Sequence, residues 1–223
     1  MRYRIKFSKK EVIRFTGHLD LHRSWERTFR RAVLPLAYSR GYNPRPRIQL
    51  ASALPLGFTS QAEYLDFWLE RSVPVDKIRT SIIAALPPGL EIHSVEPVDL
   101  RAPALQTMLI ASDFIITFLD PFQAIGEKCS EILKAERLKR ERRGKSYDLR
   151  PLIIELHSLE DDHNGCQRLF TRLSASEGAT GRPEELILAL GGEPEASRVH
   201  RTCLIFQDME DQCNQYINEI IPD

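Results

Sequence analysis

Hydrophobic and charged residues alternate at the start of the chain. Tyr3, Ile5 and Phe7 are interleaved with basic residues at positions 2, 4 and 6. A period of two residues is typical of a β-strand with one buried face. The sequence therefore predicts an N-terminal strand whose outer face is basic.

A pattern with a helical period follows this strand. The apolar residues Leu21, Trp25 and Phe29 fall on one face of a helix that we expect to begin within residues 17–20 and to end at Val33, before a Leu-Pro pair. The opposite face of this helix carries four arginines: Arg23, Arg27, Arg30 and Arg31. One face is thus expected to enter a core, and the other to be cationic.

A loop rich in glycine and proline comes next. Gly41 can take a positive φ, and Asn43 before Pro44 favours a turn. Because Pro44 and Pro46 have no N–H group, the segment after them can form a strand only at a sheet edge or with its first residues outside the ladder. We predict that strand within residues 45–52.

The remaining patterns complete two sets of βαββαβ elements. In the first half they predict a strand, a helix and a strand at 62–70, 74–86 and 89–100. In the second half they predict strands and helices at 109–119, 122–136, 149–159, 166–176, 182–190 and 199–207. This order predicts an α+β protein with two ferredoxin-like βαββαβ sandwiches in tandem, an N-terminal domain at 1–103 and a C-terminal domain at 104–223.

Charge is distributed unevenly along the chain. Residues 1–47 contain 13 Lys/Arg and three acids, which gives 13 − 3 = +10, and residues 134–150 contain eight Lys/Arg and three acids, which gives 8 − 3 = +5. Because the whole chain sums to zero, the remainder carries −15. Two basic clusters on an acidic body are typical of a protein with a polyanionic partner. We expect the two clusters to border a basic groove.

Other motifs limit the function classes. The four cysteines form no Cys-x-x-Cys pair and no Cys/His spacing of the zinc-site kind, so no metal site is predicted. Neither of the glycine-rich phosphate-binding patterns occurs, which argues against nucleotide hydrolysis. The first residues lack a long apolar run, so we expect a cytoplasmic protein without a membrane span or signal peptide.

Six segments resemble a known family, the radical-SAM-linked bacterial domain of unknown function. They are RFTGHLDL from Arg14, RRAVLP from Arg30, SRGYNPRP from Ser39, ALPLG from Ala53, EYLD from Glu63 and KRERRGKSYDLRP from Lys139. The resemblance covers most of the chain and implies a radical SAM protein, on a separate chain, as partner, with RNA modification as the process. The Cys-x3-Cys-x2-Cys run that holds a radical SAM cluster is absent, so we expect no cofactor in this chain.

Three functions fit these observations. The first is an RNA-binding accessory module that presents a structured RNA, such as a tRNA or rRNA, to a radical SAM partner. The second is an RNA-processing or RNA-modifying enzyme that acts through His18 or Asp148, with Asp20 as a further catalytic candidate. The third is a protein–protein adaptor of a radical SAM protein. Glu63 and Asp66 are an odd number of residues apart on one predicted strand, which weakens them as a catalytic pair.

The residues predicted to contact RNA combine cations for phosphates with an aromatic ring for a base. They are Arg14, Arg23, Arg27, Arg30, Arg31, Arg40, Tyr42, Asn43, Arg45, Arg47, Lys139, Arg140, Arg142, Arg143, Lys145 and Arg150.

Overall fold

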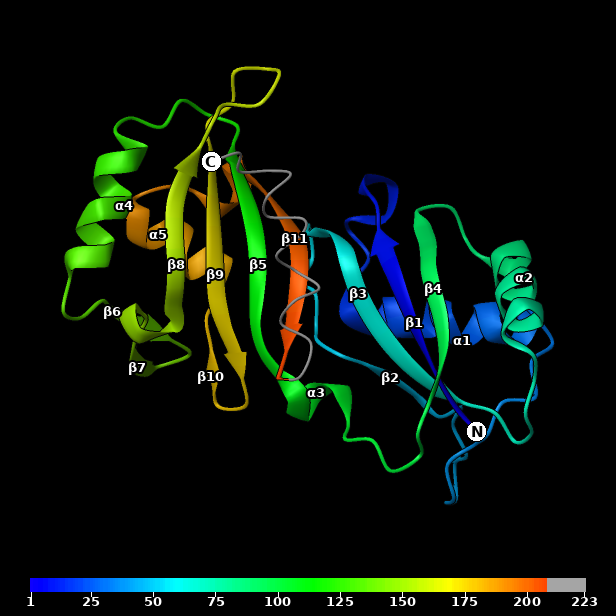
Figure 1. The fold of residues 1–223 in the computed structure, drawn as a ribbon. Coiled ribbons are helices and arrows are strands. Elements are labelled where there is room, and N and C mark those ends of the chain that lie inside the picture. Colours follow the sequence, from blue (N-terminus) through cyan, green and yellow to red (C-terminus); the bar gives the residue numbers. More distant parts are fainter. Residues whose placement is uncertain (208–223) are drawn as a thin grey trace. The chain divides into compact units, whose positions relative to one another are not determined.

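The computed structural model describes residues 1–207 and divides the chain into two compact units, with the division between Met108 and Leu109 (Figure 1). The last part of the domain predicted at 104–223, residues 208–223, lies outside the described residues. Helices are interleaved with strands along the chain, and the printed strand pairs are antiparallel, as in an α+β protein, which agrees with the predicted class.

Unit 1 contains a four-stranded antiparallel sheet with helices on one face (Figure 1). Its strands lie in the order β4-β1-β3-β2. Its elements are β1 (Arg2–Lys9), η1 (Glu11–Ile13), α1 (His18–Arg31), β2 (Ile48–Leu50), β3 (Thr59–Trp68), α2 (Val75–Ala85), β4 (Leu90–Val98) and α3 (Leu105–Met108). β2 begins two residues after Pro46, because neither Pro44 nor Pro46 can donate to a ladder.

Aromatic rings form the centre of the unit 1 core. The Trp25 ring of α1 meets Phe7 of β1 edge to face at 4.9 Å between centroids, and Phe29 stacks on Phe67 of β3 at 4.7 Å. Ile78 and Ile82 of α2 are completely buried in the same cluster. Aromatic pairs in these orientations stabilise a core beyond the area that they bury, so the two helices are firmly held on the sheet.

α1 ends two residues before the position predicted from the sequence. Its last residue is Arg31, and Val33 takes the left-handed conformation with φ 53°. The Leu34 N–H donates to the Phe29 carbonyl and the Val33 N–H to the Arg30 carbonyl, the two bonds of a Schellman motif. A β-branched residue is unfavourable at this position, which glycine usually occupies.

The predicted basic outer face of β1 is wrong for its first residues. Arg2 is only 4% exposed and donates to Asp66 through Nε at 3.0 Å and Nη2 at 2.5 Å. Arg4 also pairs with Asp66, at 2.9 Å. Because β1 lies between β3 and β4 and Arg4 is in register with Asp66, these cations balance a buried carboxylate instead of facing solvent.

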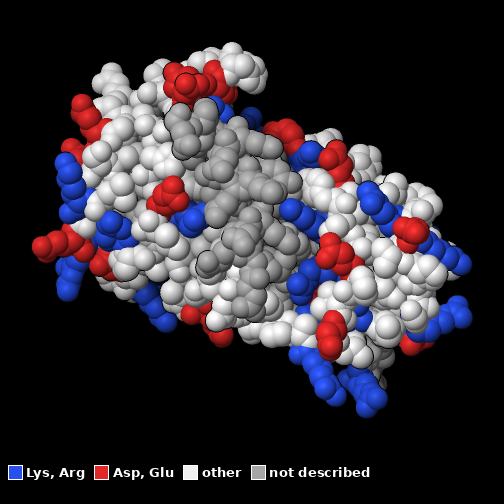
Figure 2. Space-filling view, viewed as in Figure 1, with Lys and Arg blue, Asp and Glu red and all other residues white. Residues whose placement is uncertain are grey.

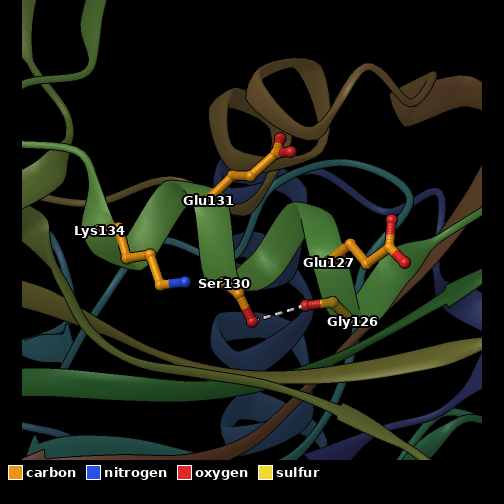
Figure 3. Close-up of a pocket in the computed structure, with 5 residues that line it drawn as sticks. All are labelled: Gly126, Glu127, Ser130, Glu131 and Lys134. Atoms are coloured by element: carbon orange, nitrogen blue, oxygen red, sulfur yellow. Dashed lines mark hydrogen bonds between the residues drawn. The ribbon is translucent and has the colours of Figure 1, made fainter.

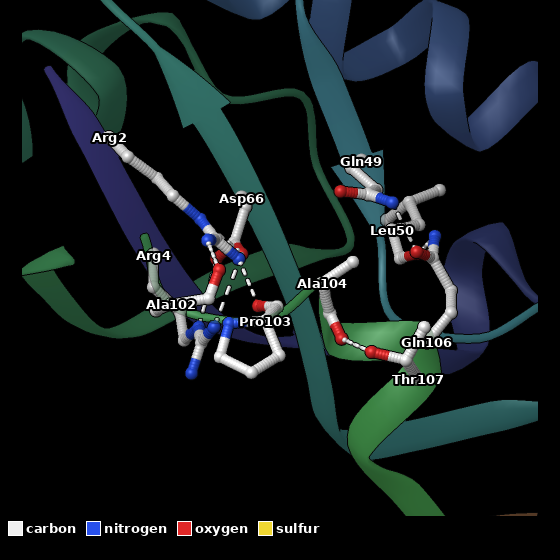
Figure 4. A network of polar contacts seen from close by, with 10 residues as sticks. All are labelled: Arg2, Arg4, Gln49, Leu50, Asp66, Ala102, Pro103, Ala104, Gln106 and Thr107. Carbon is white, nitrogen blue, oxygen red and sulfur yellow. Dashed lines mark hydrogen bonds and ion pairs between the residues drawn. The ribbon is translucent and has the colours of Figure 1, made fainter. Parts of the chain in front are cut away.

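The same arginine fastens the segment that ends unit 1 (Figure 4). Arg2 donates to the carbonyls of Ala102 and Pro103 at 2.5 and 2.8 Å. Further along, Gln106 donates to the Leu50 carbonyl at 2.5 Å and accepts a hydrogen bond from Gln49. Residues 102–106 are therefore held against the sheet of unit 1 by side chains of β1 and β2.

Unit 2 repeats the arrangement with additional elements. Its main strands are antiparallel and lie in the order β11-β5-β9-β8. Its elements are β5 (Leu109–Phe118), α4 (Ile125–Lys134), β6 (Lys139–Arg142), β7 (Lys145–Asp148), η2 (Arg150–Leu152), β8 (Ile153–Leu159), β9 (Arg168–Ser176), β10 (Ala179–Thr180), α5 (Pro183–Leu190), η3 (Pro194–Ala196) and β11 (Ser197–Phe206). α4 buries Cys129 and Ile132, and α5 buries Leu186 and Ile187.

Part of the second basic cluster, residues 139–148, forms a β-hairpin. β6 and β7 pair antiparallel, with Lys139 opposite Asp148 and Arg142 opposite Lys145. Arg143 and Gly144 connect them, with φ of 50° and 72°. Two consecutive positive φ values are typical of the tight turn that joins two strands of a hairpin. We refer to β6 and β7 with this turn as the basic hairpin.

Candidate nucleic-acid interface

A second paired structure carries the Gly/Pro loop of unit 1. Residues 37–39 and 45–47 are held together by hydrogen bonds from the Ser39 N–H to the Arg45 carbonyl at 2.8 Å and from the Arg47 N–H to the Ala37 carbonyl at 2.9 Å. The Arg45 N–H also donates to the Ser39 hydroxyl at 3.0 Å. We name residues 37–47 the arginine arm. It is a hairpin with a five-residue tip at 40–44, although the sequence predicted only a loop there.

The arginine arm is joined to the end of β3. The Ala37 N–H donates to the Trp68 carbonyl at 2.8 Å, and the Trp68 N–H donates to the Arg47 carbonyl at 3.1 Å. The Arg47 guanidinium lies over the Trp68 ring at 4.7 Å from its centroid, an attractive cation–π distance. Phe29, which precedes Arg30, packs on Phe67. The last turn of α1 and the root of the arm are therefore at the same end of β3.

Exposure separates the tip of the arm from its root. Residues 38–45 are all exposed, and Tyr42 is completely so, whereas Pro46 is buried. Gly41 does not take a positive φ, so the reason predicted for that glycine is wrong. In Figure 2, Lys and Arg side chains gather at the lower edge of unit 1, where Figure 1 draws the segment between α1 and β2. The tip thus projects cations and one aromatic ring into solvent.

The arginines predicted on α1 fall into two groups. Arg23 forms an ion pair with Asp20 at 3.1 Å, and Arg31 donates to the Ala85 carbonyl at the end of α2 at 2.7 Å. Arg27 and Arg30 are exposed, and their side chains form no hydrogen bond or ion pair with another residue among 1–207. Only the second group is free to contact a ligand without breaking an existing interaction.

Arg40 and Arg45 of the arm belong with this free group, because their side chains also have no such partner among the described residues. The stretch from Arg27 to Ala62 contains six arginines, no lysine and no acidic residue. This absence of acids is a signal in the sequence that could have separated Arg40 and Arg45 from Arg23, which has Asp20 three residues before it, since an acid near in sequence is the commonest partner on a helix or turn. The signal does not cover Arg30, because Glu26 is four residues before it and lies against His22 instead.

Arg14 is engaged elsewhere in unit 1. It pairs with Glu11 at 2.8 Å and lies over the Phe15 ring at 4.3 Å. Its backbone carbonyl accepts from the completely buried Lys9 ammonium at 2.8 Å and from the Gly57 N–H at 3.0 Å. These bonds join the loops that contain RFTGHLDL and ALPLG, so much of this sequence string has a structural role.

The basic hairpin of unit 2 is partly engaged as well. Arg140 pairs with Glu185 of α5 at 3.2 Å, and Arg150 donates to the Leu133 and Ile153 carbonyls at 2.9 and 3.1 Å. Burial, followed by the nearby Glu185 carboxylate, raises the pKa of Tyr147. Of the cations predicted to bind RNA here, those that are fully on the surface are Lys139, Arg143 and Lys145, while Arg142 is half-buried.

The three catalytic candidates have ordinary structural surroundings. His18 is the first residue of α1, and Asp20 is exposed and paired with Arg23. Asp148 accepts hydrogen bonds from the Leu138 and Arg150 N–H groups at 2.8 and 3.0 Å. These backbone bonds, that from Leu138 first, hold the pKa of Asp148 below its usual value. Its carboxylate therefore stabilises the turns that flank the basic hairpin.

One polar pair was missed by the sequence analysis. The Ser8 hydroxyl and His93 Nε2 are 2.6 Å apart across β1 and β4. Burial, then the charges of Lys6 and Lys10, lowers the pKa of His93. Ser8 is completely buried, so a substrate cannot reach its hydroxyl. The pair joins two strands and is not a nucleophilic site.

A shallow depression lies on α4 (Figure 3). It is lined by Gly126, Glu127, Ser130, Glu131 and Lys134, all from one helix. The Ser130 hydroxyl donates to the Gly126 carbonyl at 2.9 Å. The depression is thus the polar outer surface of α4, and no second element brings chemistry to it.

Within residues 1–207, no three His, Cys, Asp or Glu side chains gather where they could hold a metal ion. No helix in this part of the chain is both long and apolar enough to cross a membrane.

Comparison with known proteins gives a family but no activity. A family described as "Uncharacterized protein conserved in bacteria (DUF2344)" matches residues 2–183. No curated protein matches.

Three solved structures are among those similar to the chain. "Crystal Structure of a Cbf5-Nop10-Gar1 Complex" has 10% identity and a TM-score of 0.48, over 97% of this chain and 55% of that one. "Crystal structure of the archaeal box H/ACA sRNP Nop10-Cbf5 complex" has 12% identity and a TM-score of 0.42, over 98% and 56%. "Structure of H/ACA RNP bound to a substrate RNA containing 2'-deoxyuridine" has 11% identity and a TM-score of 0.42, over 89% and 50%. The chain spans about half the length of these chains.

Proposed function

Because the chain belongs to this uncharacterized bacterial family, its function has to be inferred from its own surface, and we propose that it is an RNA-binding accessory module. The proposed contact surface combines the arginine arm with the free arginines of α1. Lys139, Arg143 and Lys145 of the basic hairpin are proposed as further phosphate contacts.

The observation that carries this proposal is the acid-free stretch from Arg27 to Ala62. Four of its arginines, Arg27, Arg30, Arg40 and Arg45, have no side-chain partner among residues 1–207. Arginine offers a planar fork of donors that matches a phosphate, and it is the cation of choice in nucleic-acid recognition. An exposed tyrosine within the same arm adds a ring on which a base can stack. Cations and an aromatic ring on one projecting element suit RNA better than they suit an acidic protein surface.

We further propose that this module presents a structured RNA, a tRNA or rRNA, to a radical SAM protein on a separate chain. The support is the resemblance of the strings RFTGHLDL, SRGYNPRP and KRERRGKSYDLRP to the radical-SAM-linked domain. Chemistry on the RNA is then supplied by the partner. Asp20 is paired with Arg23, and Asp148 accepts the Leu138 N–H, so the contacts of these two candidates support structural roles.

The fold proposed for each unit is the ferredoxin-like sandwich. It is supported by the strand orders β4-β1-β3-β2 and β11-β5-β9-β8. In both, the first strand of the βαββαβ unit lies between the fourth and the third strands, and the second strand lies at the edge beside the third. Such a sheet with helices on one face is a frequent scaffold for RNA-binding surfaces.

The test is ultraviolet crosslinking of the protein to RNA in the bacterial cell, followed by sequencing of the bound RNA. A variant with Arg27, Arg30, Arg40 and Arg45 changed to Ala should lose most of the crosslinked RNA. Its matched control changes four exposed cations of unit 1 that lie outside the surface, Arg71, Lys77, Arg79 and Arg101, and should retain it.

Two results would contradict the proposal. The first is an equal yield of RNA from both fourfold variants. Because both variants lose four positive charges, that result would mean that RNA responds to the net charge and not to the proposed surface. The second is a wild-type protein that retains no RNA and copurifies instead with an acidic protein, which would favour the adaptor. Capture of a radical SAM protein with the crosslinked complex tests the partner separately.

A further inference from the structure

The tip of the arginine arm isolates one aromatic ring from the rest of the molecule. Tyr42 is completely exposed, and its ring makes no contact with another ring or cation among residues 1–207. Arg40 and Arg45 are close to it in sequence and are also exposed. Both faces of the Tyr42 ring are therefore open, with a free guanidinium on each side of it along the chain.

The arm that carries this ring is pre-formed. Backbone bonds join Ser39 to Arg45 and Ala37 to Arg47, and Pro44 fixes its own φ and restricts Asn43 to extended conformations. Pro46, which forms a bridge with Tyr38, is buried. Binding to such an arm costs less conformational entropy than binding to a loop that has to become ordered when the ligand arrives.

The root of the arm is equally well held. Trp68 has the Arg47 guanidinium over its ring at 4.7 Å and the Arg2 guanidinium at 5.4 Å. Arg2 is in turn fixed by the buried Asp66 carboxylate (Figure 4). Because the root is held on Trp68, the arm leaves the end of β3 in a fixed direction, and Tyr42 belongs to the exposed five-residue tip that this root presents.

We propose that Tyr42 stacks on an unpaired nucleobase while Arg40 and Arg45 contact the phosphates on either side of it. The RNA recognised is thus one with an unpaired nucleotide, in a loop, a bulge or an end. This inference rests on the proposed RNA-binding function and names the class of RNA that the same surface selects.

The geometry of RNA favours an unpaired base, and not a base within a duplex, as the stacking partner of Tyr42. In an A-form duplex the base faces are covered by their neighbours, and the major groove is too deep and narrow for side chains to enter. A ring at the end of an arm gains nothing from such a duplex except contact with its backbone. An unpaired base offers its whole face, and stacking of a base on an aromatic side chain is tolerant of sequence.

The experiment compares two labelled RNAs by fluorescence anisotropy at one salt concentration. One is a stem-loop with a seven-nucleotide unpaired loop, and the other is a perfect duplex with the same stem sequence. Wild type should bind the stem-loop more tightly than the duplex. Tyr42→Ala should lower affinity for the stem-loop by roughly 5- to 150-fold, which corresponds to about 1–3 kcal/mol for one stacked base. Affinity for the duplex should change by less than about 2-fold on the same scale.

Two controls show that the ring itself acts. Tyr42→Phe keeps the ring and should retain the affinity of wild type. A stem-loop with 2-aminopurine in the loop should lose fluorescence when wild type binds and should not do so with Tyr42→Ala. Since the Tyr42 side chain is completely exposed, both variants should keep the melting temperature of wild type.

The outcomes distinguish the two proposals. Wild type that binds neither RNA overturns the proposed function. Wild type that binds both RNAs with equal affinity, or Tyr42→Ala that weakens both alike, overturns the stacking inference and leaves RNA binding in place.

Discussion

Replacing Arg27 and Arg30 together by alanine should flatten the salt dependence of RNA binding. Both side chains are exposed and have no partner among residues 1–207. Each phosphate contact made by such a cation releases condensed counterions. The logarithm of the binding constant then falls, for each tenfold rise in salt, by about 0.9 per contact on double-stranded B-DNA and by about 0.7 per contact on single strands, and we use these two values as bounds for RNA.

The size of the effect follows from the count of free arginines. With Arg27, Arg30, Arg40 and Arg45 all on phosphates, these four contacts alone should lower the affinity by roughly 50- to 150-fold between about 50 and 200 mM salt. With Arg27 and Arg30 removed, the two arginines that remain should contribute only about 7- to 12-fold over the same change in salt. The slope itself should decrease by about 1.4 to 1.8.

The matched control is on the same helix. Arg23→Ala with Arg31→Ala removes the same charge, but Arg23 is paired with Asp20 and Arg31 donates to the Ala85 carbonyl. This second double variant should change the slope by less than half as much. Anisotropy titrations at five salt concentrations measure both slopes, and thermal melts monitored by circular dichroism verify folding.

The reasoning would be refuted by equal slopes in the two double variants. That result would mean that RNA responds to the net charge of the helix and not to the arginines that the fold leaves free. A slope unchanged in both would remove α1 from the interface altogether.

Three further predictions concern stability, each measured by thermal or urea unfolding of the variant beside wild type. Asp66→Asn leaves two inward cations without their carboxylate and should destabilise the protein by about 3–5 kcal/mol, whereas a loss below about 1 kcal/mol would show that the pair is not energetically coupled. Val33→Gly removes a β-branched residue from a position with φ 53° and should stabilise the protein by roughly 0.5–1 kcal/mol. The reason is that the penalty of the left-handed conformation for valine exceeds the backbone entropy that glycine loses on folding. A lower melting temperature would contradict this prediction. Because the pKa of His93 is lowered in the folded protein, the unfolded chain takes up that proton first, so stability should fall as pH drops below the ordinary value of 6.5, and His93→Gln should reduce this dependence; an unchanged pH profile would exclude His93 as its source.

Local periodicity accounts for most of the fold that could be predicted. The alternation of Tyr3, Ile5 and Phe7 marks β1, and the spacing of Ile78 and Ile82 marks α2, because each pattern records which side of an element faces a core. The sequence of the basic hairpin shows no hydrophobic period, since neither of its strands buries an apolar face. Its turn at Arg143 and Gly144 carries only a weak signal, because Asn or Asp before Gly is the usual sequence there.

The candidate site was harder to predict, because residues that are distant in the sequence decide whether a cationic side chain is paired or free. Arg2 and Arg4 look like surface cations until the β1–β3 register brings Asp66 to them across more than 60 positions of the chain. Arg47 likewise meets Trp68 only when the arm is joined to β3. Counting charges along the sequence therefore overstates the positive surface of residues 1–47.

A different property of the sequence does survive folding. An arginine in a stretch without acids can be neutralised only by a carboxylate that the fold brings from elsewhere. For Arg27, Arg30, Arg40 and Arg45 no such carboxylate arrives among residues 1–207, although the fold supplies one for Arg2 and Arg4. Unpaired cations repel one another, by about 1 kcal/mol for two charges about 4 Å apart in bulk water, and a sequence of this composition could relieve that repulsion with a single acid. Its absence over the whole stretch from Arg27 to Ala62 is what we expect of the RNA-binding surface proposed above.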